Sequence, residues 1–278
     1  MKRISGWRAS LVALGLAVAM PQAGLAHRAW LLPSATVLSG EEPWVTVDAA
    51  ISNDLFYFEH NPMRLDGLQV LGPDAAAVAP QNASTGRYRS TFDIRLARTG
   101  TYRIAVVNDT LLASYKLGGQ TKRLRGDAAS IRNELPGDAQ GVQVMRNQSR
   151  VEAFVTVGRP TEAALQSVGK GLEMVPVTHP NDLFVGDVAR FRFLLDGEPA
   201  AGVEVTVIPG GIRYRDQLGE MKLVTDAEGL VGIDWPTPGM YWLSASHGAR
   251  RGEAGAGGTL EKPARRAGYT ATLEVLPQ

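Results

Sequence analysis

The chain of 278 residues contains no cysteine. This absence excludes disulfide bonds, cysteine-based zinc sites, cysteine-ligated iron–sulfur clusters and catalysis by a cysteine nucleophile. Aromatic residues make up only 7% of the sequence, and no apolar run beyond residue 26 approaches the roughly 20 residues that cross a membrane. We therefore expect no membrane-spanning segment beyond that point.

The chain has many turn-forming residues instead. Its 31 glycines and 16 prolines separate short segments in which apolar and polar residues alternate, a pattern typical of β-strands with one buried face. A helical bundle is excluded by the same pattern. The predicted strands of the first half are residues 45–51, 68–71, 87–94, 101–107 and 149–157, and those of the second half are 172–177, 189–195, 203–208, 223–225, 231–235, 241–245 and 269–276.

These two series predict an all-β chain with two immunoglobulin-like β-sandwich domains. The first domain covers residues 27–158 and the second covers 172–278, joined by a linker at 159–171. Between residues 116 and 148 the alternation weakens, and we expect a solvent-exposed excursion there, with one short helix over 128–135.

The first 26 residues have the pattern of a secretory signal peptide. Lys2, Arg3 and Arg8 precede an uncharged run over 9–20, and the small residue Ala26 stands before the expected cleavage point. Cleavage there removes three positive charges and changes the formal net charge from +1 to −2. A chain without net positive charge gives no reason to expect nucleic acid as a partner. We expect a periplasmic protein.

Cleavage after Ala26 makes His27 the new N-terminus. A terminal histidine offers its α-amino group and its imidazole Nδ1 as a chelating pair, which suits copper, nickel or cobalt. If cleavage falls a residue or two away, His27 is an ordinary polar residue. The sequence thus predicts a transition-metal site that depends on where the leader ends.

Three further histidines, His60, His179 and His247, are candidate ligands for the same metal. Each stands beside Pro, Asn, Gly or Ser, in positions where a fold can present a ligand and where any polar residue is tolerated. If the two sandwiches pack end to end, His27, His179 and His247 share the cleft between them. The four histidines are too widely spaced to form a motif, and no His-Glu-x-x-His sequence or acidic calcium loop is present.

Several stretches of the mature sequence resemble a bacterial periplasmic family. They are residues 26–33 (AHRAWLLP), 169–176 (GKGLEMVP), 178–183 (THPNDL), 225–229 (TDAEG) and 238–243 (PGMYWL). The family is known as a domain of unknown function, and its members are often described as periplasmic components of cobalt or nickel uptake. The resemblance covers nearly the whole mature chain. It implies export, β-sandwich modules and a transition-metal role, with His27 and His179 as the matching positions.

Three functions remain open at this point. The one we expect is a periplasmic protein, not an enzyme, that binds nickel, cobalt or copper and hands the ion to an envelope transporter or another membrane protein. A copper-dependent polysaccharide oxidase is the enzymatic alternative, because such enzymes also use an exported β-sandwich with an N-terminal histidine and one further histidine. The third possibility is a metal-free module that binds proteins or glycans at the cell envelope.

Overall fold

The computed structural model describes residues 27–249 and 257–278. The predicted signal peptide at 1–26 lies outside these ranges. Within them the regular structure is mostly β-strand, with one α-helix and two short 3-10 helices, so the all-β prediction is confirmed. No helix in the described part of the chain is long and apolar enough to cross a membrane.

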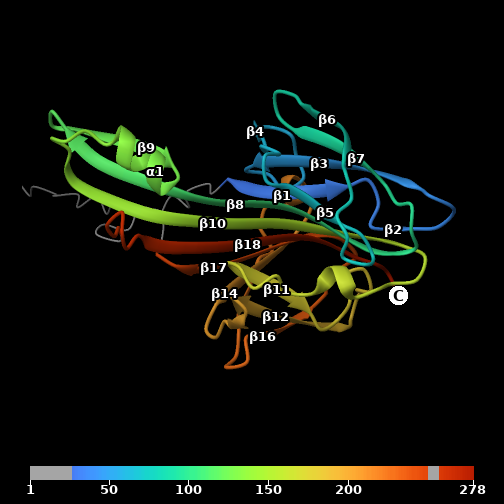
Figure 1. Ribbon diagram of the computed structural model, residues 1–278. Helices are drawn as coiled ribbons and strands as arrows, with labels where there is room; N and C mark the ends of the chain where they lie inside the picture. The colour runs from blue at the N-terminus through green and yellow to red at the C-terminus, as the bar shows by residue number, and fades with distance from the viewer. Residues whose placement is uncertain (1–26, 250–256) are drawn as a thin grey trace, which may run out of the picture.

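The strands form three sheets that lie in layers (Figure 1). The first sheet has the order β1 (Arg28–Pro33), β3 (Trp44–Ser52), β7 (Ser90–Arg95) and β6 (Gln81–Thr85), and β4 (Asn61–Pro62) also pairs with β3. Its centre is β3, in which Val45, Val47 and Ala49 are buried and the residues between them are not. This alternation places one face of the sheet against the core.

The middle layer is a nine-stranded sheet. Its order is β15 (Met221–Val224), β14 (Glu204–Pro209), β17 (Gly239–Gly248), β18 (Ala264–Val275), β10 (Gln140–Val157), β8 (Gly100–Leu117) and β5 (Leu68–Leu71), with β2 (Val37–Leu38) paired to β10 and β9 (Gln120–Gly126) paired to β8. The two halves of the chain meet where β10 and β18 pair in parallel over nine residue pairs, from Met145 with Ala264 to Ala153 with Thr272.

The third sheet is smaller. It has the order β11 (Leu172–Pro176), β12 (Val188–Leu195) and β13 (Glu198–Pro199), with β16 (Leu230–Asp234) also paired to β12. The middle sheet therefore has a layer on each face, and β10 serves both because successive side chains of a strand point to opposite faces. Val151, Ala153 and Val155 belong to the core under the first sheet, whereas Phe154 belongs to the core under the third.

This arrangement modifies the prediction of two sandwich domains. The predicted boundary at 159–171 separates two cores but not two sheets, because the β10–β18 pairing carries one sheet through both halves. The linker also contains a short 3-10 helix, η1 (Ala163–Leu165), whose Ala164 and Leu165 are buried. Two self-contained sandwiches are therefore not confirmed in that form.

A third, smaller apolar cluster joins the two halves. It contains the buried residues Trp30 and Leu55 from the first half and Ile208 and Trp242 from the second. The indole Nε1 of Trp242 donates a hydrogen bond of 2.9 Å to the backbone oxygen of Ala29. This contact fixes the start of β1, and so the residue before it, against the second half.

The excursion after residue 116 is the far end of a long hairpin. The strands β8 and β10 each run for 18 residues, well beyond the predicted 101–107 and 149–157, and carry β9 and the helix α1 (Ala128–Glu134) at their tip (Figure 1). The short helix was predicted at 128–135 and is confirmed. Asp127 caps it by accepting a hydrogen bond of 2.7 Å from Ser130 N. Ile131 of this helix packs against Ala113 of β8 and Val144 of β10.

Candidate functional site

Two of the four candidate histidines lie side by side. The rings of His27 and His60 stack with their centroids 3.8 Å apart and an interplanar angle of 14°. His27 directly precedes β1 and His60 directly precedes β4, and both of these strands pair with the same end of β3, where Arg28 lies opposite Ser52 and Asn61 opposite Ile51. The β3 register therefore brings together two residues that are 33 positions apart in the sequence.

The loop that carries His60 is held by the residue before it. Glu59 Oε1 accepts hydrogen bonds of 2.8 Å from both Asn53 N and Asp54 N, which closes residues 53–60 into a tight excursion from the end of β3. Hydrogen bonds from two backbone N–H groups to one carboxylate are charge-assisted and strong. Glu59 thus fixes the position of the backbone at His60, the next residue.

The same loop is anchored to the apolar cluster below it. Phe56 and Phe58 lie 5.6 and 5.5 Å from the ring of buried Trp30. Trp30 Nε1 donates a hydrogen bond of 2.8 Å to Ser52 Oγ, and that hydroxyl donates to Asp54 O at 2.5 Å. The backbone beneath the two histidines is therefore firmly supported, although both imidazoles are exposed to solvent.

The charge next to His27 is balanced. Arg28 Nη1 donates a hydrogen bond of 2.6 Å to Asn53 O, and its guanidinium carbon lies 5.8 Å from the centre of the Trp242 ring. Partial burial lowers the pKa of Arg28, while the Glu220 and Asp54 carboxylates act in the opposite direction. Two acidic groups thus act against the positive charge of Arg28 beside His27.

The histidine pair supplies two ligands of a metal site and no more. Among the described residues, no three histidine or carboxylate side chains are placed to hold one ion. A metal lies in the plane of each imidazole that binds it, so the stacked rings must turn toward an edge-on arrangement before both can bind one ion. Their exposure leaves room for this. The pair fits a transition metal if the α-amino group of His27 supplies the third nitrogen.

His179 lies elsewhere and has other partners. Its Nε2 is 2.9 Å from Thr101 Oγ1, and its Nδ1 accepts a hydrogen bond of 3.2 Å from Asn181 N. Partial burial lowers the pKa of His179, against the smaller opposing effects of Thr161, Asp182 and Glu162. Both ring nitrogens are thus occupied: Nε2 holds the 178–182 loop to the base of the long hairpin, and Nδ1 bonds within the loop itself.

The expected convergence of His27, His179 and His247 is therefore wrong. His179 contacts Thr101, which pairs with Thr156, and Thr156 lies opposite Val37, beyond the far end of β1 from His27. His247 is exposed near the end of β17, opposite Ala267 in the middle sheet. The error comes from assuming end-to-end packing, because layers joined through one sheet place these three described residues on different elements, where they do not meet.

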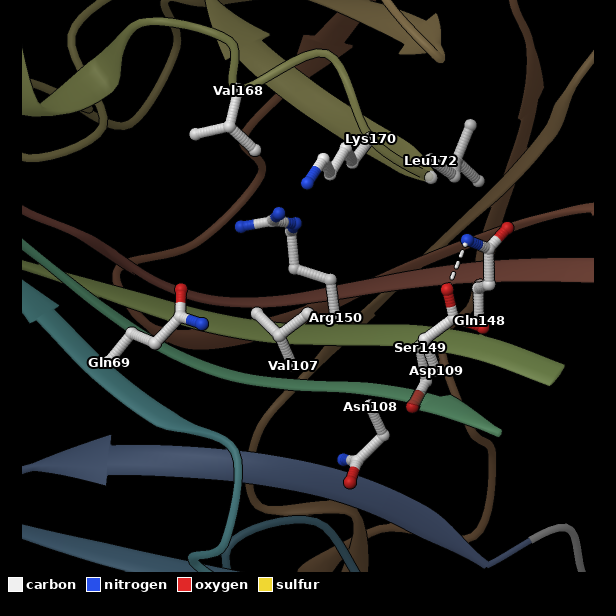
Figure 2. Close-up of a pocket in the computed structure, with 12 residues that line it drawn as sticks. Gln69, Val107, Asn108, Asp109, Gln148, Ser149, Arg150, Val168, Lys170 and Leu172 are labelled. Atoms are coloured by element: carbon white, nitrogen blue, oxygen red, sulfur yellow. Dashed lines mark hydrogen bonds between the residues drawn. The ribbon is translucent and has the colours of Figure 1, made fainter. Parts of the chain in front are cut away.

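A cavity of about 450 Å³ opens at a different place, between the middle sheet and the segment that leads into β11 (Figure 2). The middle sheet contributes residues from β5, β8, β10 and β18, and the opposite wall is made by residues 168–172. Figure 2 shows the Arg150 guanidinium and the Lys170 ammonium group directed toward each other across this space. Asp109, also on the wall, is bound by Arg146 at 2.8 Å and by Gln148 at 3.0 Å, and the Arg146 contact holds the pKa of Asp109 low.

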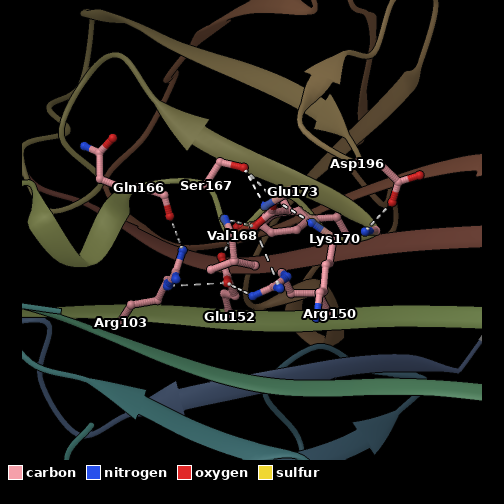
Figure 3. A network of polar contacts seen from close by, with 12 residues as sticks. Arg103, Arg150, Glu152, Gln166, Ser167, Val168, Lys170, Glu173 and Asp196 are labelled. Carbon is pink, nitrogen blue, oxygen red and sulfur yellow. Dashed lines mark hydrogen bonds and ion pairs between the residues drawn. The ribbon is translucent and has the colours of Figure 1, made fainter. Parts of the chain in front are cut away.

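Buried charges continue from this cavity into the interface between the middle and third layers (Figure 3). Arg150 Nη1 donates a hydrogen bond of 3.0 Å to Glu152 Oε1, and Arg103 Nε lies 3.9 Å from the same oxygen. Tyr269 donates to Glu152 Oε2 at 2.7 Å, and burial, with the nearby Glu152 charge, raises the pKa of Tyr269 well above its ordinary value. The phenol therefore remains protonated and acts as a donor.

Glu173 completes this network from the third sheet. Its carboxylate accepts hydrogen bonds from the Ser167 hydroxyl at 2.7 Å and from the backbone N–H groups of Val168, Gly169 and Lys170 at 3.0, 2.8 and 3.3 Å. None of these charged residues was among the predicted site residues. The available signal was that Arg103, Arg150, Glu152 and Glu173 are charged residues inside segments predicted to be strands, where an apolar core side chain is the ordinary choice.

The sequence matches one protein family over residues 24–249, described as Domain of unknown function (DUF4198). The chain belongs to this family. The search of curated proteins finds no match.

Among solved structures the similarities are weak. The D0-D1 domain of intimin has 11% identity over 88% of this chain and 97% of its own, with a TM-score of 0.21. The human OSCAR ligand-binding domain has 13% identity over 89% of this chain and 98% of its own, with a TM-score of 0.20. A marsupial T cell receptor has 12% identity over 90% of this chain and 74% of its own, with a TM-score of 0.20. Similarities at this level do not bear on function.

Proposed function

We propose that this chain is an exported, periplasmic protein that binds one transition-metal ion through His27 and His60. The observation that carries the proposal is the contact between the two imidazoles, whose centroids are 3.8 Å apart at the point where the predicted mature chain begins. Two imidazoles and an α-amino group form an all-nitrogen donor set, which suits nickel, cobalt or copper. The firm support beneath the pair holds the two backbones close together, while the exposed rings can turn toward an ion.

The exposure of the pair favours a carrier over a storage or structural site. A structural metal is normally enclosed by four protein ligands, whereas here both imidazoles face solvent and coordination positions remain open to another molecule. We therefore infer that the ion is handed to a membrane protein of the envelope, such as a cobalt or nickel transporter. We further propose that each half of the chain is an immunoglobulin-like β-sandwich and that the two halves share the middle sheet.

The experiment compares metal binding by four forms of the protein in titration calorimetry with Ni²⁺ and Cu²⁺. The first form begins at His27, the second carries one extra alanine before it, the third is His60→Ala, and the fourth is the matched control His247→Ala, an exposed histidine on β17. We expect the second and third forms to lose about 10- to 100-fold in affinity. The control should bind like the first form. His179→Ala should also bind like the first form, because its nitrogens are engaged elsewhere.

Each outcome has a clear consequence. Equal affinity for the native and the extended chain contradicts the terminal-amine mechanism, and unchanged affinity in His60→Ala contradicts the pair. If no form binds metal, the metal-free envelope module becomes the better hypothesis. Mass determination of the exported protein reports in parallel whether the chain begins at His27.

A copper-dependent oxidase is the second candidate, because an N-terminal histidine and one further histidine are also the ligands of that class. Oxygen consumption by the copper-loaded protein with a reductant and a polysaccharide separates the two functions. We expect no polysaccharide-dependent consumption above that of free copper.

A further inference from the structure

The cavity between the middle sheet and residues 168–172 is separate from the histidine pair and independent of the proposed metal function. At about 450 Å³ it falls within the range of about 300–1,000 Å³ that is usual for small-molecule sites. The contacts of its charged residues indicate what it binds.

Arg150 has donors that the protein does not use. The residue is only 6% exposed, so its guanidinium is removed from bulk water. The hydrogen bond to Glu152 at 3.0 Å is the one side-chain hydrogen bond it makes within the described residues, and its Nη2 stands 3.8 Å from Glu173, beyond hydrogen-bonding distance. Its Nε is buried and has no hydrogen-bond partner in the described part of the chain. Buried donors of this kind are ordinarily satisfied.

Glu152 and Glu173 pair with Arg150, at 3.0 and 3.8 Å, but both carboxylates are shared with other donors. Glu173 is occupied by the Ser167 hydroxyl and three backbone N–H groups, and Glu152 by Arg150 and Tyr269. Lys170 forms no ion pair with any described residue, and its ammonium group is directed toward the Arg150 guanidinium (Figure 2). An anion bound to the unused donors of Arg150 would therefore gain a second charge-assisted contact from the exposed Lys170.

The other lining residues suit a ligand that has polar groups and a carbon chain as well as a negative charge. The cavity also contains Asp109, whose carboxylate Arg146 and Gln148 bind, and Gln148 in turn accepts from Arg265. Beside these it presents the side-chain amides and the hydroxyl of Gln69, Asn108 and Ser149, and an apolar strip of Val107, Val168 and Leu172. Amide and hydroxyl groups both donate to and accept from a ligand hydroxyl. We propose that the cavity binds a small hydroxycarboxylate, with its carboxylate between Arg150 and Lys170 and its hydroxyl groups on the amide side chains.

The test is titration calorimetry of the metal-free protein with D-gluconate, with the uncharged polyol sorbitol and with inorganic phosphate. We expect gluconate to bind, sorbitol not to bind, and phosphate to bind at least about tenfold more weakly than gluconate, since it has charge but no hydroxylated chain. Lys170→Gln should weaken gluconate binding by about tenfold or more, because it removes one of two charge-assisted contacts. The control Lys116→Gln changes a lysine at the far end of β8 and should bind like the native chain.

Arg150→Lys provides a second variant that keeps the buried positive charge but loses the planar fork of donors, and it should also weaken gluconate binding. The circular dichroism spectrum of Arg150→Lys reports whether this variant folds. If Arg150→Lys does not fold, Lys170→Gln still tests the proposal. The proposal is overturned by absence of a gluconate signal, by equal binding of sorbitol, by phosphate binding as tightly as gluconate, or by unchanged affinity in Lys170→Gln. None of these results bears on the histidine pair, which lacks metal throughout the experiment.

Discussion

At the scale of single residues, the structure gives the histidines different tasks. His27 and His60 are exposed and stack on each other, whereas His179 uses both ring nitrogens inside a hydrogen-bond network. Thr101 continues that network to Thr156 at 3.0 Å, and Thr156 donates to Asn181 Oδ1 at 2.9 Å. The histidines looked equivalent in the sequence, but His27 and His60 are candidate ligands, whereas His179 holds its loop to the long hairpin. We call this His179 contact the latch.

The His179 latch predicts a pH dependence of stability. Its pKa in the folded protein is lowered from the ordinary 6.5 by burial, so below pH 6.5 the unfolded chain binds a proton that the folded chain resists. Stability that is fully present above pH 6.5 is then lost as the pH falls from 6.5 through the lowered folded pKa. We expect part of the fall in melting temperature between pH 7.5 and pH 5 to disappear in His179→Gln but to persist in His247→Ala. An unchanged pH dependence in His179→Gln contradicts the latch.

The sequence could predict the candidate ligands but not their neighbours. His27 and His60 were both identified, because a terminal histidine and histidines in loops can be recognised from the sequence alone. Their contact depends on β1 and β4 pairing with the same end of β3, and registers of this kind are set by packing between distant segments. The importance of Glu59 is similarly hidden, because a glutamate beside a histidine looks the same whether it holds a loop or faces solvent.

At the scale of elements, alternation predicted most of the strands with buried residues and missed segments whose side chains are mostly exposed. Residues 149–157 were predicted as a strand and are the buried half of β10, but its outer half over 140–148 is mostly polar and was assigned to an excursion. The strand β6 was missed for the same reason, since all five of its residues are exposed. Backbone pairing holds most of these segments, with few buried side chains such as Val144 and polar contacts such as Thr85 with Ser90, and it leaves little trace in the side-chain pattern.

The turn over 226–229 gives a prediction at this scale. Asp226 Oδ1 accepts hydrogen bonds from Glu228 N at 3.0 Å and Leu230 N at 2.8 Å, and Gly229 has φ of +73°. A Cβ at Gly229 would stand 2.4 Å from Phe193 O, a backbone atom that cannot move without breaking β12. We expect Gly229→Ala to combine the cost of a left-handed alanine, about 1–2 kcal/mol, with a backbone displacement.

The matched control for that turn is Gly202→Ala. Gly202 has a similar φ of +69° but nothing within 4 Å of its added Cβ, so this variant measures the left-handed conformation alone. Urea unfolding of both variants should show Gly229→Ala losing clearly more free energy of unfolding than Gly202→Ala. Equal losses would mean that the Phe193 contact relaxes at no cost.

At the scale of the whole molecule, the middle sheet makes the two halves depend on each other. Nine residue pairs join β10 to β18, and Phe154 of β10 is part of the core under the third sheet. The buried Arg103, Arg150 and Glu152 of the first half meet Glu173 and Tyr269 of the second. Removing one partner of such a buried charge network leaves the others uncompensated, which strongly destabilises what remains.

We therefore expect the two halves to unfold together and neither to fold alone. A fragment covering 159–278 exposes the β18 edge that β10 normally covers, loses Phe154 from its core and buries Glu173 without Arg150. In urea, far-ultraviolet circular dichroism and tryptophan fluorescence of the chain from His27 should give one coincident transition, while the fragment should show no cooperative transition. The tryptophans report on both halves, because Trp30 lies in the first and Trp235 and Trp242 in the second. Two separated transitions, or a fragment that unfolds cooperatively, would show that the shared sheet joins domains that are already stable by themselves.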